Sequence, residues 1–234
     1  MIVNYNLNKT YLKTGTKYAS CVSVIKCFRI YILVTMLFSG CARSLPSVET
    51  HLPPSPFKVS NVYRASIPKS LVRVGLLPVY GLQDISLQES IYGELFKQLI
   101  FEWIKIEPST LQQAYHQSIF SSIEQLPHGF FDFLQKQYNL DGLLLIDITH
   151  YQPYYPIQIG MRAQLIELQT KRTLWMADEI FDANDIHVQS SIQQYQHDNS
   201  THSFETFNNK FLNSPSAFTS FAAHTLFSQL AEKI

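Results

Sequence analysis

The chain has 234 residues, of which 46% are hydrophobic and 15% charged, and its formal net charge is zero. This composition suits one domain with a packed core and excludes a disordered chain. The first 41 residues hold five of the 18 basic residues and none of the 18 acidic ones, so the remainder has a net charge of −5. An acidic remainder lacks the basic surface that nucleic acid requires, and we expect no nucleic-acid partner.

An uncharged, mostly apolar run, Ile30–Gly40, follows Lys26 and Arg29. Its 11 residues suit the hydrophobic region of a signal peptide, whereas a helix that spans a bilayer needs about 20. The run ends on the small residues Ser39 and Gly40, immediately before Cys41. The pattern predicts a signal peptide over residues 1–40, cleaved between Gly40 and Cys41.

The segment Leu37–Cys41 resembles the lipobox of bacterial lipoproteins, in which the cysteine is acylated and becomes the new N-terminus. It departs from that pattern at Phe38, where leucine is usual. The resemblance implies a lipid on Cys41, and several acyl chains together anchor a protein stably. Ala42 replaces the aspartate that retains many enterobacterial lipoproteins in the inner membrane, so the resemblance favours the outer membrane, facing the periplasm. The alternative is a short hydrophobic anchor with an incidental cysteine.

No cysteine lies beyond Cys41, so the rest of the chain holds no disulfide and no zinc site built on cysteines. Residues 41–69 are rich in proline and serine, which predicts a locally stiff linker. A domain is predicted over residues 70–234.

In the first half of this domain, Val72–Tyr80 is apolar and rich in β-branched residues, which predicts a strand. Ser86 and Glu89 match a capping box and predict a helix that begins there. Ile104–Ile106 predicts a short strand, and residues 111–122 a loop or short helix.

In the second half, Phe130–Tyr138 predicts a helix, and the continuous apolar run Leu143–Ile148 a central strand. Ile157–Leu165 alternates apolar and polar residues, which indicates a half-buried strand. A turn at residues 169–172 leads to its hairpin partner, Leu174–Phe181. Two helices, over residues 185–197 and 215–233, are predicted to follow, joined by a polar loop.

This order of elements predicts an α+β fold, a two-layer sandwich with a mixed sheet of about five strands. The sheet ends in a C-terminal β-meander, and the helices are expected to pack on one face.

The order of elements resembles the fold shared by the curli secretion lipoprotein CsgG, the penicillin-binding-protein activator LpoB and the N-terminal domain of TolB. The segment Asp141–Asp185 is also similar to uncharacterised envelope lipoproteins of planctomycetes. These resemblances imply a periplasmic lipoprotein fold and name no activity. Curli pores use membrane-spanning hairpins whose strands need about 9–11 residues, and the connections at residues 151–156 and 169–172 are too short for them.

Four acidic residues between Asp178 and Asp185 could suggest a metal, but they lack the glycine-punctuated spacing of a calcium loop. The preferred interpretation is structural: Asp178 pairs with Arg162 across the hairpin, and Asn184 or Asp185 caps the next helix. The eight histidines are scattered, and the sequence has no nucleophile elbow and no glycine-rich phosphate loop. We therefore expect no catalytic residue, metal or cofactor.

The most unusual segment is the corner "YQPYYP", in which Pro153 and Pro156 stiffen the chain around Tyr151, Tyr154 and Tyr155. Exposed tyrosine rings are favoured at interfaces, which predicts a recognition patch for a protein or glycan partner. The alternative is a rigid corner whose rings pack over the sheet.

Taken together, the sequence predicts a lipid-anchored periplasmic module for binding or assembly in the cell envelope. It would be non-enzymatic and act through a protein partner. The alternative is a structural component of an envelope or secretion complex that oligomerises through its sheet edges; an enzyme ranks third.

Overall fold

The computed structural model describes residues 54–98, 100–199 and 208–231. The strands of this part are β1 (Asn61–Arg64), β2 (Arg73–Leu76), β3 (Glu102–Lys105), β4 (Gly142–Gln152), β5 (Gln158–Glu167) and β6 (Thr173–Asp182). The helices are α2 (Ile85–Phe96), α3 (Pro108–Tyr115), α4 (Phe130–Tyr138), α5 (Ile186–Asn199), α6 (Asn208–Asn213) and α7 (Pro215–Ala231).

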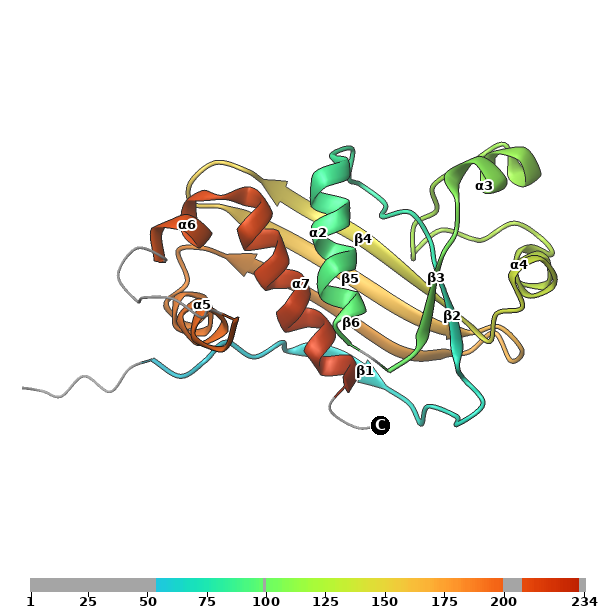
Figure 1. Cartoon of the computed structure of the whole chain (residues 1–234), viewed down its shortest axis with the longest axis horizontal. Coiled ribbons are helices and arrows are strands. Elements are labelled where there is room, and N and C mark those ends of the chain that lie inside the picture. Colours follow the sequence, from blue (N-terminus) through green and yellow to red (C-terminus); the bar gives the residue numbers. More distant parts are fainter. Residues whose placement is uncertain (1–53, 99, 200–207, 232–234) are drawn as a thin grey trace, which may run out of the picture. The chain divides into compact units, whose positions relative to one another are not determined.

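The six strands form one mixed sheet in the order β1-β6-β5-β4-β2-β3. Strands β4, β5 and β6 follow one another antiparallel, β1 adds antiparallel to β6, and β2 runs parallel to both β3 and β4. Helices α2 and α7 lie side by side across one face of this sheet (Figure 1). The predicted α+β sandwich and its C-terminal meander are confirmed, with six strands where about five were predicted.

The main core lies between the sheet and helices α2, α5 and α7. Alternate residues of β5, among them Ile159, Met161 and Ala163, point into it because successive side chains of a strand face opposite sides. The helices supply buried aromatic and aliphatic side chains, including Phe221 of α7 and Ile91 of α2. The alternation that predicted β5 therefore also decides which face the helices cover.

A second, smaller core occupies the opposite face at one end of the sheet. Leu143 and Leu145 of β4 point away from the main core and pack with Phe130 and Leu134 of α4 and Leu111 of α3. The expectation that the helices pack on one face holds for α2, α5 and α7 and is wrong for α3 and α4. The reason is visible in the continuous apolar run of β4, because such a strand must be covered on both faces.

Three local details differ from the sequence prediction. Strand β1 lies within the segment predicted as a linker, since Asn61–Arg64 pairs with β6. The N-cap of α2 is Asp84 and not the predicted Ser86. Oδ1 of Asp84 accepts a hydrogen bond of 2.8 Å from the Ser86 amide. Helix α6 begins at Asn208 inside the predicted polar loop. Short elements of this kind carry too few residues for a clear hydrophobic period.

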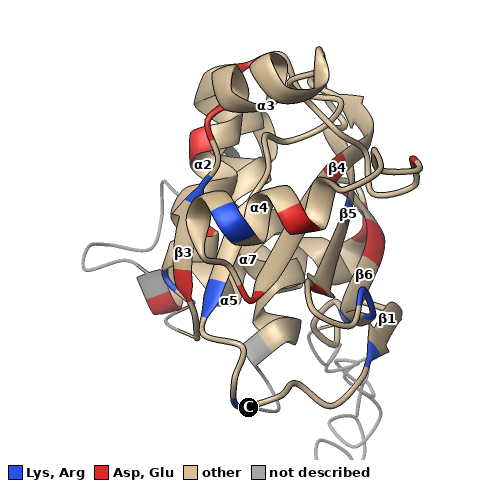
Figure 2. Ribbon diagram, turned by 90° about the vertical axis from the view of Figure 1, so that its right-hand side faces the viewer, with Lys and Arg blue, Asp and Glu red and all other residues tan. Residues whose placement is uncertain are grey.

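Charged residues are interspersed on the end of the domain that carries α3 and α4. Figure 2 shows positions of Lys and Arg beside positions of Asp and Glu on neighbouring elements there.

Candidate functional site

The predicted aromatic corner joins β4 to β5, and we call Tyr151–Pro156 the tyrosine corner. The side chains of Tyr154 and Tyr155 are 81% and 65% exposed. Tyr151 is half-buried and packs against the main core, where its strand position lies opposite Ile159. Two of the three predicted tyrosines are thus exposed, and the third packs into the domain.

The corner is braced by one of its own side chains. Nε2 of Gln152 donates a hydrogen bond of 2.8 Å to the backbone oxygen of Pro156. Because this bond spans the corner, and because two prolines restrict its backbone, the exposed rings are carried on a stiff support.

The strand register fixes where the corner lies. Gln152 pairs with Gln158 across β4 and β5, and Gln158 pairs with Asp182 across β5 and β6. The amide of Ala183 donates to the Ile157 oxygen at 2.9 Å. The tyrosine corner and the start of α5 therefore lie at the same end of the sheet, which we call the corner end.

The chain also enters the domain at the corner end. We call Pro54–Ser60 the N-terminal strap, and α5 holds its first half. Ser190 Oγ donates to the Pro54 oxygen at 2.9 Å, the Phe57 amide donates to Ser191 Oγ at 2.6 Å, and the His187 ring donates to the Ser55 oxygen at 2.8 Å. A segment predicted as linker is therefore fastened to the domain from Pro54 onward.

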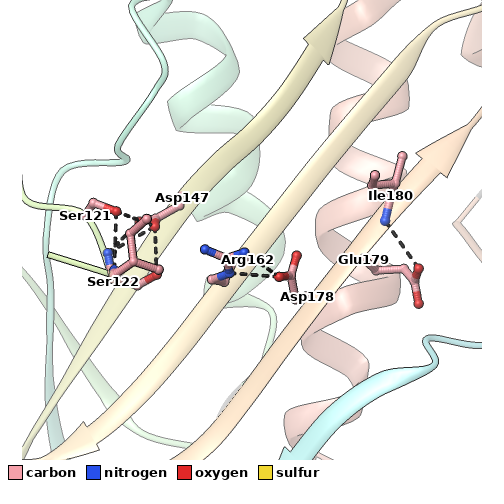
Figure 3. A network of polar contacts seen from close by, with 8 residues as sticks. Ser121, Ser122, Asp147, Arg162, Asp178, Glu179 and Ile180 are labelled. Atoms are coloured by element: carbon pink, nitrogen blue, oxygen red, sulfur yellow. Dashed lines mark hydrogen bonds and ion pairs between the residues drawn. The ribbon is translucent and has the colours of Figure 1, made fainter.

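A second surface lies on the side of β5 and β6 that faces away from the main core. Here the two bonds from Arg162 to Asp178 Oδ2, 2.6 and 2.8 Å long, link the two strands (Figure 3). Around this pair the side chains of Tyr63, Met176 and Ile180 are exposed. We call these five residues the open face. The predicted pairing of Arg162 with Asp178 is confirmed.

The remaining acidic residues of this region make structural contacts. Glu179 Oε2 accepts from the amide of Ser60 at 2.7 Å and so ties the strap to β6. Asp185 Oδ1 accepts from the His187 amide at 2.7 Å and caps α5, as predicted. Within the described ranges, no three side chains of His, Cys, Asp or Glu are grouped so that they could hold a metal ion.

A buried polar cluster, which the sequence did not predict, lies between three helices. Glu94 of α2 is only 5% exposed. Its Oε1 accepts from Tyr195 of α5 at 2.9 Å and from Lys97 at 2.7 Å, and its Oε2 lies 3.5 Å from Nδ1 of His224 on α7. Burial opposes the charge of Glu94, but His224, Lys97 and Tyr195 outweigh it and lower the pKa of this carboxyl.

This cluster holds helices together. A hollow of about 180 Å³ lies beside Tyr195 and His224. Oε1 of Glu94 accepts two hydrogen bonds, whereas Oε2 faces Nδ1 of His224 at 3.5 Å and accepts none. Burial and the charge of Glu94 raise the pKa of the Tyr195 hydroxyl, which therefore stays protonated and donates. A glutamate between Ile91 and Leu95 on an apolar helix stripe was the one signal in the sequence.

The residues of the predicted lipid site, Gly40 and Cys41, lie outside the described residues. Among the helices of the described part, none combines the length and apolarity needed to cross a bilayer.

No protein-family model matches the chain, and no curated protein matches it in sequence. Solved structures do. The PelC dodecamer of Paraburkholderia phytofirmans matches with a TM-score of 0.41 and 11% identity, over 74% of this chain and 99% of that one. The lipoprotein GNA1162 of Neisseria meningitidis matches with a TM-score of 0.34 and 14% identity, over 56% and 99%. The hypothetical protein CT253 of Chlamydia trachomatis matches with a TM-score of 0.39 and 15% identity, over 68% and 96%. The resemblance to CsgG, LpoB, TolB and planctomycete lipoproteins stays a prediction.

Proposed function

We propose that the chain is a lipid-anchored component of the bacterial cell envelope that acts by binding a protein partner and not as an enzyme. The lipid is carried by Cys41, after cleavage behind Gly40. The domain faces the periplasm from the outer membrane. We also propose that the domain has the periplasmic lipoprotein fold that the order of its elements resembles.

The observation that carries this proposal is the open face. Its polar side chains already satisfy each other across the sheet, as Arg162 and Asp178 do, so a partner can cover them without leaving a charge unpaired. Its exposed apolar side chains, Tyr63, Met176 and Ile180, would lose contact with water on binding. A surface whose exposed side chains are largely apolar and whose charges are paired with each other suits a protein partner.

Lipid attachment is tested by intact mass spectrometry of membrane-extracted protein, wild type beside Cys41→Ser. We expect a wild-type species that starts at Cys41 and carries added acyl mass, and an unprocessed species for the variant. Unprocessed protein in both samples would contradict the lipid anchor.

The partner surface is tested by placing a photo-crosslinking phenylalanine analogue at Ile180. Ile123 is the matched control, because it is also an exposed isoleucine but lies in the loop between α3 and α4. We expect one discrete crosslinked envelope protein from position 180 and none from position 123. Equal patterns from both positions would contradict a partner on the open face.

A specific observation also keeps the oligomerising component as the second candidate. Within the described residues, the outer strands β1 and β3 each pair on one side. Such edges can pair with another copy of the chain. Light scattering of the detergent-extracted protein distinguishes the two candidates, since a discrete multiple of the monomer mass favours assembly.

A further inference from the structure

The strap makes the tether between the lipid and the domain shorter than the predicted linker of residues 41–69. Pro54 is already fixed to Ser190, and it follows Cys41 by only 13 positions. A coil of that length has a root-mean-square span of ~20 Å, and its full extension is ~45 Å. A domain held in this way stays close to the bilayer that holds its lipid.

The strap also decides which end of the domain the tether leaves. Pro54 and Ser55 lie against the first turns of α5, through Ser190 and His187. Helix α5 begins directly after β6, at the corner end. The tether therefore starts from the end of the sheet that carries the tyrosine corner, and it pulls that end toward the membrane.

The side chains exposed at the corner end suit a lipid surface. Tyr154 and Tyr155 project from the stiff corner, and Ile186, at the start of α5, is 58% exposed. Tyrosine is enriched where protein meets the headgroup layer, because its ring is apolar and its hydroxyl can stay hydrated. Isoleucine adds apolar surface that gains from leaving water.

The acidic side chains at the corner end indicate which lipid headgroups this surface can contact. Asp84 caps α2 next to Tyr151, and Asp182 and Asp185 flank the end of β6. Carboxylates at these positions repel anionic headgroups and tolerate zwitterionic ones. The surface that fits is therefore a zwitterionic bilayer, such as one of phosphatidylethanolamine and phosphatidylcholine.

We infer that the corner end, through Tyr154, Tyr155 and Ile186, rests on the zwitterionic surface of the bilayer that holds the lipid anchor. This rests on the proposed function, because the tether matters only if Cys41 carries the lipid. The open face lies on a face of the sheet and not at its corner end, so Tyr63 and Met176 stay accessible to a protein partner.

The experiment uses the full mature chain, reconstituted in vesicles of phosphatidylethanolamine and phosphatidylcholine with brominated acyl chains, which quench nearby tryptophan. The probes are Tyr154→Trp and Tyr155→Trp. Tyr63→Trp is the matched control, because Tyr63 is also exposed and lies opposite Met176, six residues before Asp182 along β6. That separation places it ~20 Å from the corner end. Trp103 and Trp175 are present in every variant, so the difference from wild type isolates each probe.

We expect quenching of the probes at 154 and 155 at least about twofold stronger than at 63, with a shift of their emission to shorter wavelength. Equal quenching at the three positions, in vesicles that carry the protein on flotation, would overturn the inference and leave the corner to a protein partner. Failure of the protein to float with the vesicles would instead overturn the lipid anchor, and with it the proposed function.

Discussion

Two carboxylates are buried on opposite faces of the sheet, and different kinds of donor compensate their charge. Asp147 of β4 is 2% exposed and accepts from Ser121 Oγ at 2.8 Å, Ser122 Oγ at 2.7 Å and the Ser122 amide at 3.0 Å (Figure 3). Glu94 is held by a lysine, a tyrosine hydroxyl and a nearby histidine. The donors to Asp147 described above are neutral groups of one loop, whereas Glu94 joins α2, α5 and α7.

The difference has two consequences. Asp147 is the buried acceptor for Ser121 and Ser122, in a loop that has little regular structure of its own. Glu94 acts together with the apolar packing between three helices, and the lowered pKa of its own carboxyl links its contribution to pH. We therefore expect Asp147 to be the larger contributor to stability and Glu94 to be the one that responds to pH.

The largest effect is expected for Asp147→Ala. It leaves two serine hydroxyls and one amide without their buried acceptor, which we expect to lower the free energy of unfolding by about 2–4 kcal/mol. Chemical denaturation of purified protein measures this. Asp147→Asn should destabilise less, because its amide oxygen can take the place of Oδ2, the atom that accepts from both serine hydroxyls. A loss below that of Asp178→Ala, on the exposed side of β6, would contradict the role given to Asp147.

The second effect is expected for Glu94→Gln, at about 1–2 kcal/mol near neutral pH, because the amide oxygen can still accept from Tyr195. The pKa of Glu94 in the folded chain lies below its ordinary value of 4.5. Its charge therefore stabilises the fold above pH 4.5, and this contribution is lost as the pH falls through the folded pKa. Unfolding curves between pH 5 and pH 3 should show the gap between wild type and variant closing. A gap that stays constant would show that the charge of Glu94 does not matter.

A third and smaller effect is expected for Tyr195→Phe, about 1 kcal/mol, since one hydrogen bond to Glu94 is removed. Loss of this donor should also raise the pKa of Glu94 and move the acid limb of the stability curve to higher pH. Tyr92→Phe is the matched control, because Tyr92 lies on α2 like Glu94, but its hydroxyl donates to the Leu77 oxygen, at 2.9 Å, and not to Glu94. The control should lose similar stability without moving the acid limb. Identical acid limbs in both variants would contradict the coupling of Tyr195 to Glu94.

The two carboxylates also show what sequence can predict. The meander was predictable because alternation along β5 and a short turn fix its register with β6, and that register places Arg162 opposite Asp178. Tyr151 lies opposite Ile159 and faces the main core only because a bulge between Ile148 and His150 shifts the register of β4, which simple alternation does not predict. The tyrosine corner and the Asp185 cap follow from local chemistry in the same way.

The partners of the buried carboxylates were not predictable. Tyr195 lies 101 residues from Glu94, and their meeting depends on how three helices cross, which no local pattern encodes. Asp147 interrupts the apolar run of β4, which signals that donors must exist, but Ser121 and Ser122 lie in a weakly patterned loop. The strap was missed because its prolines and serines resemble a linker, although Phe57 packs on Phe181 with ring centroids 5.3 Å apart.

The smallest effect is expected on the open face, where Arg162 and Asp178 are a quarter to a third exposed. A partly exposed pair of this kind gains little from its charge, because water screens it, so a double-mutant cycle of Arg162→Ala and Asp178→Ala should give a coupling of only about 0.2–1 kcal/mol. If a partner covers the open face, the pair becomes desolvated, and removing one member then leaves a buried charge. The single variants should therefore weaken crosslinking through position 180 more than the double variant does. An equal loss of crosslinking in the two single variants and the double variant would mean that the pair stays hydrated in the complex. The apolar side chains around it would then provide the binding energy.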